Sequence, residues 1–246
     1  RVAFIVVGAP GILLAIVVRM SIAEPIRGLV EHRQVVDTPV PMMEVVSLLW
    51  SRRSFRHMAM GAALNAFAGY SISNWIASFM IRSHGMSTGE LGTWLALTIG
   101  LGGAVGVFCG ALLADRLAPR DKRWYMWLPA LAGIICVPFT ASTYLVAGAY
   151  TSLMMGIIPG ILFNVYLGNT IATTHGLVGL RMRALSSAIL FLIINIIGLG
   201  LGPWSIGMLS DYLEPSLGIE SLRYAMLYLL PPIMFWSVRP EHYWRQ

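Results

Sequence analysis

The sequence predicts an all-α protein that crosses a membrane seven times, and three observations predict this class. Hydrophobic residues make up 57% of the 246 positions and charged residues only 11%, a composition typical of integral membrane proteins. Uncharged apolar runs of about 17 residues or more, enough to cross a hydrocarbon core of about 30 Å, recur along the chain. Basic residues gather between alternate runs, as the positive-inside rule requires.

The positions of the charged residues define the expected crossings. The uncharged stretch 124–180 is too long for one crossing, so it must hold two, with a turn near 142–148. The expected spans are 2–18, 57–81, 91–114, 124–146, 148–173, 184–210 and 224–238. We therefore divide the chain into a membrane helix at 1–18, a connecting loop at 19–56, a six-helix bundle at 57–240 and a tail at 241–246.

The long connection at 19–56 contains a predicted amphipathic helix. Pro41 is a favourable first helical residue, and Met43, Val46, Leu49 and Trp50 recur at helical spacing ahead of the arginines at 52–56. This pattern favours a helix lying on the inner membrane surface. A linker helix without lipid contact is the alternative.

Two local patterns mark helix boundaries in the bundle. Ser87, followed three residues later by Glu90, is a capping-box pattern and predicts a helix start. The pair Pro159-Gly160 should break or bend the fourth helix of the bundle, because proline removes a backbone hydrogen bond.

The distribution of positive charge predicts the orientation. Fourteen of the 17 Lys and Arg residues lie in the long connection, the loop after Asp115, the turn at 181–183 or the tail. The positive-inside rule places these segments in the cytoplasm, and we expect the membrane to be a bacterial inner (plasma) membrane. The chain begins at Arg1 inside an apolar run and without a signal peptide, so we expect it to be a fragment.

The stretch after the second helix of the bundle resembles a known family. A small residue, Leu-Ala-Asp-Arg and a later Arg, at Ala111, Leu113, Ala114, Asp115, Arg116 and Arg120, resemble the helix 8 to 9 loop signature of the major facilitator superfamily. Ala111 and Ala118 stand where the family signature has glycines. The strings ADRLAPRDKRWYMWLPA from Ala114, SFRHM from Ser54 and RSHGMSTGELG from Arg82 are similar to the spinster-type branch.

This resemblance implies a fold and an activity. The chain would be helices six to twelve of a transporter, that is, its C-terminal six-helix half plus the preceding helix, and its main partner would be the missing N-terminal half. The branch implies alternating-access transport of a small amphiphile such as a lysolipid or sphingoid phosphate. A facilitator-type transporter of an organic anion or a drug is one alternative, and a receptor or scaffold without transport is a second.

Glycines form stripes on two of the expected helices. Gly102, Gly106 and Gly110 lie on one, and Gly198 and Gly202 lie on the other, which matches the first after a shift of 96 positions. Stripes of small residues permit close helix packing, and the opposite topology of the two helices is typical of the inverted repeats of transporters. Because these helices face the other half in the family, we expect both stripes to pack against the missing half.

Neutral polar residues at membrane depth are the candidate substrate-binding residues. Phe67, Tyr70 and Asn74 share one helix face, and Tyr166 and Asn169 share another beside the predicted break. Asn195 lies on the second glycine stripe. Each asparagine could instead form a hydrogen bond between helices. Asn65 lies half a turn from Asn74 around the helix axis, and we choose the Asn74 face.

Asp115, Arg116, Arg120 and Arg123 are the candidate gating residues. An acid at a helix end can accept hydrogen bonds from the first amides of a neighbouring helix and release them when the halves move. Simple anchoring of the topology is the alternative.

Other classes of function find no support in the sequence. There is no HExxH, no Gly-x-Ser-x-Gly and no buried pair of aspartates, so we expect no enzyme, cofactor or metal. The net charge of +6 reflects the basic loops, so no nucleic-acid partner is expected, and membrane lipids are the expected surroundings. All the acidic residues lie at helix ends or in loops, so proton coupling would depend on the missing half.

Overall fold

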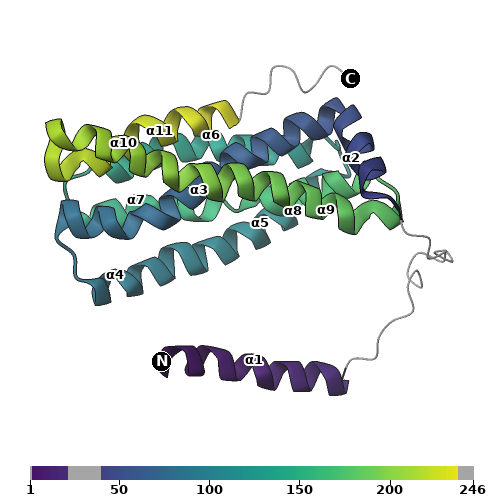
Figure 1. Ribbon diagram of the computed structural model, residues 1–246, viewed down its shortest axis with the longest axis horizontal. Helices are drawn as coiled ribbons and strands as arrows, with labels where there is room; N and C mark the ends of the chain where they lie inside the picture. The colour runs from purple at the N-terminus through teal and green to yellow at the C-terminus, as the bar shows by residue number, and fades with distance from the viewer. Residues whose placement is uncertain (1, 22–39, 238–246) are drawn as a thin grey trace. The chain divides into compact units, whose positions relative to one another are not determined.

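The computed structural model describes residues 2–21 and 40–237, and every regular element in them is a helix (Figure 1). The chain divides into two units, Arg1–Pro39 and Val40–Gln246. In the first unit, α1 (Val2–Ser21) is a 20-residue apolar helix. The remainder of the predicted connection, at 22–39, and the predicted tail lie outside the described residues.

The second unit is a bundle of helices. Its elements are α2 (Met42–Ser51), α3 (Arg53–His84), α4 (Thr88–Leu95), η1 (Ala96–Leu101), α5 (Gly102–Leu117), α6 (Trp124–Leu145), α7 (Ala149–Leu162), α8 (Val165–Gly176), η2 (Leu180–Met182), α9 (Arg183–Ile194), η3 (Asn195–Leu201), α10 (Gly202–Leu217), η4 (Gly218–Glu220) and α11 (Ser221–Ser237). They combine into six long rods, namely α3, α4–η1–α5, α6, α7–α8, α9–η3–α10 and α11, which lie side by side in Figure 1.

These rods are long enough to cross a membrane. Four helical stretches of the described residues are long and apolar enough to cross one: Thr88–Leu117, Trp124–Leu145, Ala149–Gly176 and Leu180–Ser237. The last has 58 residues and turns at Gly218, where φ is +53°, so it supplies two rods. α3 has 32 residues and is more polar, and at about 1.5 Å per residue it is also long enough to cross. With α1, the chain has the seven helices that the sequence predicts.

The predicted helix start at Ser87 agrees with the structure, whereas the break predicted at Pro159-Gly160 lies slightly later, because α7 continues through this pair and ends at Leu162. Ser87 is the N-cap of α4, and its side chain accepts a hydrogen bond from the Glu90 backbone N–H at 3.4 Å. The Glu90 carboxylate accepts a hydrogen bond from the Tyr150 hydroxyl, which connects α4 to α7. The fourth rod is interrupted between α7 and α8, where the Asn164 side chain donates to the Gly160 carbonyl at 3.1 Å.

Two π-helical segments interrupt the glycine-bearing rods. η1 ends immediately before Gly102, and η3 ends immediately before Gly202. π-helical turns are rare and occur frequently at functional sites. The spacing of apolar side chains in the sequence does not distinguish π-helical from α-helical backbone hydrogen bonding, so neither segment was predicted.

The glycine stripes pack inside the bundle, so the prediction that they face a missing half was wrong. A Cβ built on Gly106 would lie 1.9 Å from the Ile161 oxygen, and one on Gly110 would lie 2.9 Å from the Val165 Cα. On the second rod, Gly198 and Gly202 meet α3, and the Gly202 Cβ would lie 2.7 Å from the Phe67 oxygen. A glycine stripe indicates that a helix approaches closely, but it does not say which helix.

Two apolar clusters stabilise the bundle. One includes Phe79, Tyr144 and Met226 and joins α3, α6 and α11. The other includes Val45, Leu49 and Leu190 and attaches α2 to α3 and α9. α2 lies at the end of the bundle where α8 ends and α9 begins (Figure 1). We call this the basic end, because the basic segments 52–56, 116–123 and 181–183 lie there.

Candidate functional site: a cavity within the bundle

A cavity of about 300 Å³ lies between α3, η1, α6, α7, α8 and α9. Most of its lining is aliphatic or aromatic. Its polar lining residues are Asn65, Tyr70, Ser73, Thr98, Thr140, Thr143, Tyr144, Ser152, Asn164 and Tyr166. Volume and lining are typical of a small-molecule site, in which a few polar groups stand among apolar ones.

Small residues on two helices leave the space for this cavity. A Cβ on Gly156 would come no closer than 3.9 Å to Thr143, and one on Gly69 would lie 3.7 Å from Phe163. At Gly160, by contrast, a Cβ would lie 2.7 Å from the Thr98 oxygen. The π-helical segment η1 and α7 therefore touch backbone to backbone at the cavity wall, while Gly69 and Gly156 keep its interior open.

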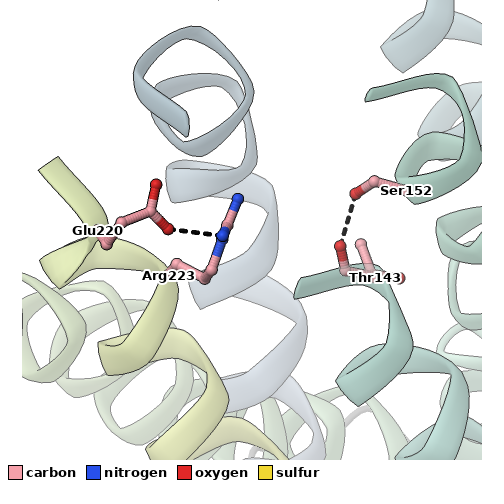
Figure 2. Close-up of polar contacts among 4 residues, drawn as sticks. All are labelled: Thr143, Ser152, Glu220 and Arg223. Atoms are coloured by element: carbon pink, nitrogen blue, oxygen red, sulfur yellow. Dashed lines mark hydrogen bonds and ion pairs between the residues drawn. The ribbon is translucent and has the colours of Figure 1, made fainter. Parts of the chain in front are cut away.

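Three hydroxyl groups of the lining donate hydrogen bonds to backbone carbonyls of the protein. Ser152 donates to the Thr143 carbonyl at 2.6 Å and joins the start of α7 to the end of α6 (Figure 2). Thr143 and Thr98 donate to carbonyls one turn earlier on their own helices, both at 2.9 Å. These bonds hold the hydroxyl groups of Ser152, Thr143 and Thr98 in place, so none of the three has an unpaired donor in the cavity wall.

Two buried polar atoms of the lining residues have no hydrogen-bond partner in the described part of the protein. They are the Thr140 hydroxyl oxygen and the Asn65 side-chain carbonyl oxygen, both buried. A buried polar atom without a hydrogen bond is unfavourable by about 1–3 kcal/mol, so each is suited to accept a hydrogen bond from a ligand or a water molecule.

The cavity lining carries no formal charge. None of its 25 residues, all within the described ranges, is Asp, Glu, Lys, Arg or His. A charged group transferred here from water would lose its hydration without gaining an opposite charge. The cavity is therefore suited to an uncharged part of a ligand, such as an alkyl chain or a ring with one or two hydroxyl groups.

The structure places only some of the predicted substrate residues in the cavity wall. Tyr70 and Tyr166 line it. Phe67 is 7% exposed and packs beneath the second glycine stripe. Asn169 is 2% exposed and donates to the Val165 carbonyl at 3.1 Å.

Asn74 and Asn195 are exposed and lie outside the lining. Asn74 donates to the Tyr70 carbonyl at 2.8 Å. Asn195 donates to the Phe191 carbonyl at 2.8 Å and lies 3.5 Å from the Tyr70 hydroxyl, a weak contact between η3 and α3. A role for either residue in substrate binding stays a prediction.

Most of the α3 lining follows the face of Asn65, and Tyr70 is the one member of the predicted Phe67, Tyr70 and Asn74 face that also lines the cavity. Asn65, Gly69, Ser73, Ile76 and Met80 follow one another at intervals of three or four residues and all line the cavity. The small and polar residues at the start of this series are the sequence signal that could have identified the face.

The four predicted gating residues lie at the basic end and are exposed. Asp115 forms no ion pair or hydrogen bond with the described residues, so its carboxylate is available to another part of the protein. In the same loop, the Asp121 side chain accepts a hydrogen bond from the Arg123 backbone N–H at 2.9 Å. A gating role stays a prediction.

A charged cluster joins α3 to α11 at the opposite end of the bundle. Arg223 pairs with Glu220 at 2.7 Å (Figure 2), and its guanidinium lies 5.7 Å from the Phe79 ring centroid. The His84 ring packs edge-on against Phe79. Burial, together with the positive charge of Arg223, lowers the pKa of His84 below its ordinary value, against the opposing effects of Glu220 and of a hydrogen bond to the backbone of Ala147.

The sequence matches the family model of the Major Facilitator Superfamily over residues 1–203. The chain belongs to the major facilitator superfamily. Its bundle is the C-terminal six-helix half of the facilitator fold, and α1 is the helix before it. Membership, together with the long apolar helices, places the chain among integral multi-pass membrane proteins.

Three similar proteins support this assignment. An MFS-type efflux pump of Mycolicibacterium smegmatis is 30% identical over 233 residues, which are 94% of this chain and 52% of the relative. Two crystal structures of a bacterial homolog of the human lysosomal transporter Spinster are each 27% identical to this chain. The inward-facing unoccupied form has a TM-score of 0.67 over 97% of this chain and 56% of the homolog. The inward-facing occupied form has a TM-score of 0.63 over 96% and 54%. The chain thus spans about half the length of these relatives.

Proposed function

We propose that this chain is part of a secondary active transporter that moves a small amphiphile, such as a lysolipid or a sphingoid phosphate, by alternating access. The cavity carries the proposal, because a largely apolar, uncharged space of about 300 Å³ suits the uncharged part of an amphiphile. The likeness to the homolog of the lysosomal transporter Spinster supports transport, and the resemblance of the sequence to the spinster-type branch suggests the class of substrate.

In this proposal the two ends of the substrate bind in different places. The apolar part enters the cavity, where Tyr70, Tyr166, Asn65 and Thr140 offer the polar contacts. A phosphate or another charged group would be unfavourable there, so it binds to residues outside this lining. The missing N-terminal half supplies them, together with any group that couples transport to protons.

The proposed orientation has the basic end in the cytoplasm of a bacterial cell. The arginines at 52–56, 116–123 and 181–183 lie together at that end, and the positive-inside rule favours its retention on the cytoplasmic side. In such an orientation the Glu220–Arg223 cluster lies on the outer side.

A counterflow assay tests the substrate class. The complete protein that carries this chain is reconstituted in proteoliposomes loaded with unlabelled lysolipid, and uptake of labelled lysolipid is followed. Labelled organic acid and labelled cationic drug, each against its own unlabelled form, are the matched comparisons. We expect counterflow of the lysolipid only. Counterflow of the acid or the drug without the lysolipid would contradict the proposed substrate.

Drug efflux is the second candidate function, and the relative from Mycolicibacterium smegmatis favours it. An apolar cavity also suits a drug ring system, so the cavity alone does not separate the two candidates. Counterflow of the labelled cationic drug in the assay above separates them. A protein that folds but shows no counterflow of any of the three compounds would instead support a receptor or scaffold.

A further inference from the structure

α2 and the start of α3 form a bend at the basic end of the bundle. We call Met43, Trp50, Arg52, Arg53 and Arg56 the α2–α3 elbow. Arg52 leaves the helical conformation, with φ −82° and ψ 113°, between the end of α2 and the start of α3. With 10 residues, α2 is too short to cross a membrane.

The position of α2 is fixed by one of its faces. Val45 and Leu49, four residues apart, are buried at 0% and 1% exposure in the apolar cluster that includes Leu190 of α9. α2 therefore packs against the ends of the membrane-crossing rods and does not project freely from them.

A second face of α2 is apolar and exposed. Met43 and Trp50, seven residues apart, lie on the same side of the helix and are 75% and 56% exposed. Tryptophan is favourable at the level of lipid head groups, and an apolar face on a helix at this level is stabilised by entering the boundary between head groups and acyl chains.

The elbow also carries three positive charges. Arg52, Arg53 and Arg56 are exposed and form no ion pair with the acids of the described residues. α2 itself has one acid, the exposed Glu44. Guanidinium groups bind phosphate oxygens through paired hydrogen bonds, so the charge and the chemistry of the elbow complement an anionic lipid head group.

Met60 places these arginines at the edge of the apolar layer. On α3, Arg53, Arg56 and Met60 share one face, because they are three and four residues apart. Met60 is 49% exposed, and after Arg56 the described part of α3 carries no Lys, Arg, Asp or Glu before Arg82. The arginines therefore lie where the apolar wall of α3 begins.

We propose that the α2–α3 elbow binds anionic phospholipids, with Met43 and Trp50 in the interfacial layer and the three arginines on the lipid phosphates. This inference does not depend on which substrate is transported. Because α3 also supplies one wall of the cavity, lipid bound at the elbow holds the first turn of a rod that borders the proposed substrate site.

Lipid retention by the purified complete protein tests the proposal. The protein in a neutral detergent is incubated with equal amounts of phosphatidylglycerol and phosphatidylethanolamine, and the lipids that remain bound after gel filtration are measured by mass spectrometry. The triple variant Arg52→Gln, Arg53→Gln, Arg56→Gln should retain about threefold less phosphatidylglycerol, since each arginine near an anionic lipid contributes to binding. Its retention of phosphatidylethanolamine should not change.

A second triple variant removes the same charge from the same end of the bundle. Arg120→Gln, Lys122→Gln, Arg123→Gln should keep phosphatidylglycerol close to the wild-type amount. Equal losses in the two triple variants would show a general effect of charge and overturn the proposal. Unchanged retention in the elbow variant would overturn it as well.

Two further measurements keep the test decisive. The first applies if circular dichroism shows that the elbow triple variant does not fold. The variant Trp50→Ser keeps all charges and should still lower the retention of phosphatidylglycerol. Wild-type retention in Trp50→Ser would refute the proposal. Inorganic phosphate should not displace the lipid. Displacement by phosphate would indicate a site for a free anion instead.

Discussion

The Ile161 carbonyl oxygen lies 1.9 Å from the position that a Cβ on Gly106 would take. Only glycine fits at residue 106, because the obstructing atom belongs to the backbone and cannot move as the end of a side chain does. This contact joins the α4–η1–α5 rod to the α7–α8 rod next to its break.

Gly106→Ala should therefore destabilise the bundle strongly. The added methyl group forces the two rods apart, and overpacking of this kind costs ~3 kcal/mol. Gly168→Ala is the matched control, because a Cβ on Gly168 would meet no atom within 4 Å and alanine favours a helix over glycine by about 1 kcal/mol. Thermal unfolding in detergent should show a lower midpoint for Gly106→Ala alone. Equal midpoints for both variants would refute the close contact.

The two asparagines of α3 should differ in their effect on transport. Asn65 lines the cavity and Asn74 does not, so Asn65→Ala should lower lysolipid counterflow about tenfold, as expected when a hydrogen bond of roughly 1.4 kcal/mol is lost. Asn74→Ala should leave counterflow within about twofold of wild type. A larger loss of counterflow in Asn74→Ala than in Asn65→Ala would instead support substrate binding at Asn74.

His84 should make the stability of the protein depend on pH. Burial and the charge of Arg223 lower its pKa in the folded state, while Glu220 opposes this effect, so the unfolded chain binds the proton more readily. The stabilisation is complete above the ordinary pKa of about 6.5 and is lost as the pH falls below that value.

Thermal unfolding between pH 7.5 and pH 5.5 measures this dependence. The midpoint of the wild type should fall over this range, and that of His84→Gln, which cannot be protonated, should fall less. Parallel pH profiles would show that His84 does not contribute.

Asp115 is predicted to hold one state of the transport cycle. Asp115→Asn removes a charge that, in the proposed gate, would accept hydrogen bonds from the end of a neighbouring helix, so the balance between inward-open and outward-open states should shift. Asp121→Asn in the same loop is the control, because the Asp121 side chain already bonds to the Arg123 backbone. Labelling of an introduced cysteine from each side of the membrane measures the balance, and identical labelling in both variants would leave Asp115 as an anchor of topology.

The fold could be predicted from the sequence further than the site could. The uncharged runs and a break close to Pro159-Gly160 follow from hydrophobicity and from the missing proline N–H, and the structure has both, with the break between Leu162 and Val165, just after the pair. The helices that pack against the glycine stripes could not be predicted. Gly106 and Gly198 indicate that another helix packs closely, but the sequence does not show which helix it is. Their partners, Ile161 and Ala66, are far from them in the sequence.

The position of the cavity could not be predicted for a related reason. Helical spacing groups Asn65 with Ser73, and Tyr70 with Asn74, but only the packing of α6 and α7 decides that Asn65, Tyr70 and Ser73 line the cavity and that Asn74 does not. Residues of α6 such as Thr140 and Thr143 gave no sequence signal, since a threonine in a membrane helix commonly bonds to its own backbone, as Thr143 does here.

The most direct test of the account is lysolipid counterflow in variants that fill the cavity from Gly156. The nearest atom to a Cβ at this position is 3.9 Å away, so Gly156→Ala should fold and transport normally, whereas Gly156→Leu should fold and lose most counterflow because its side chain occupies the space of the substrate. Counterflow by a folded Gly156→Leu protein at the level of Gly156→Ala would contradict the claim that this cavity holds the substrate.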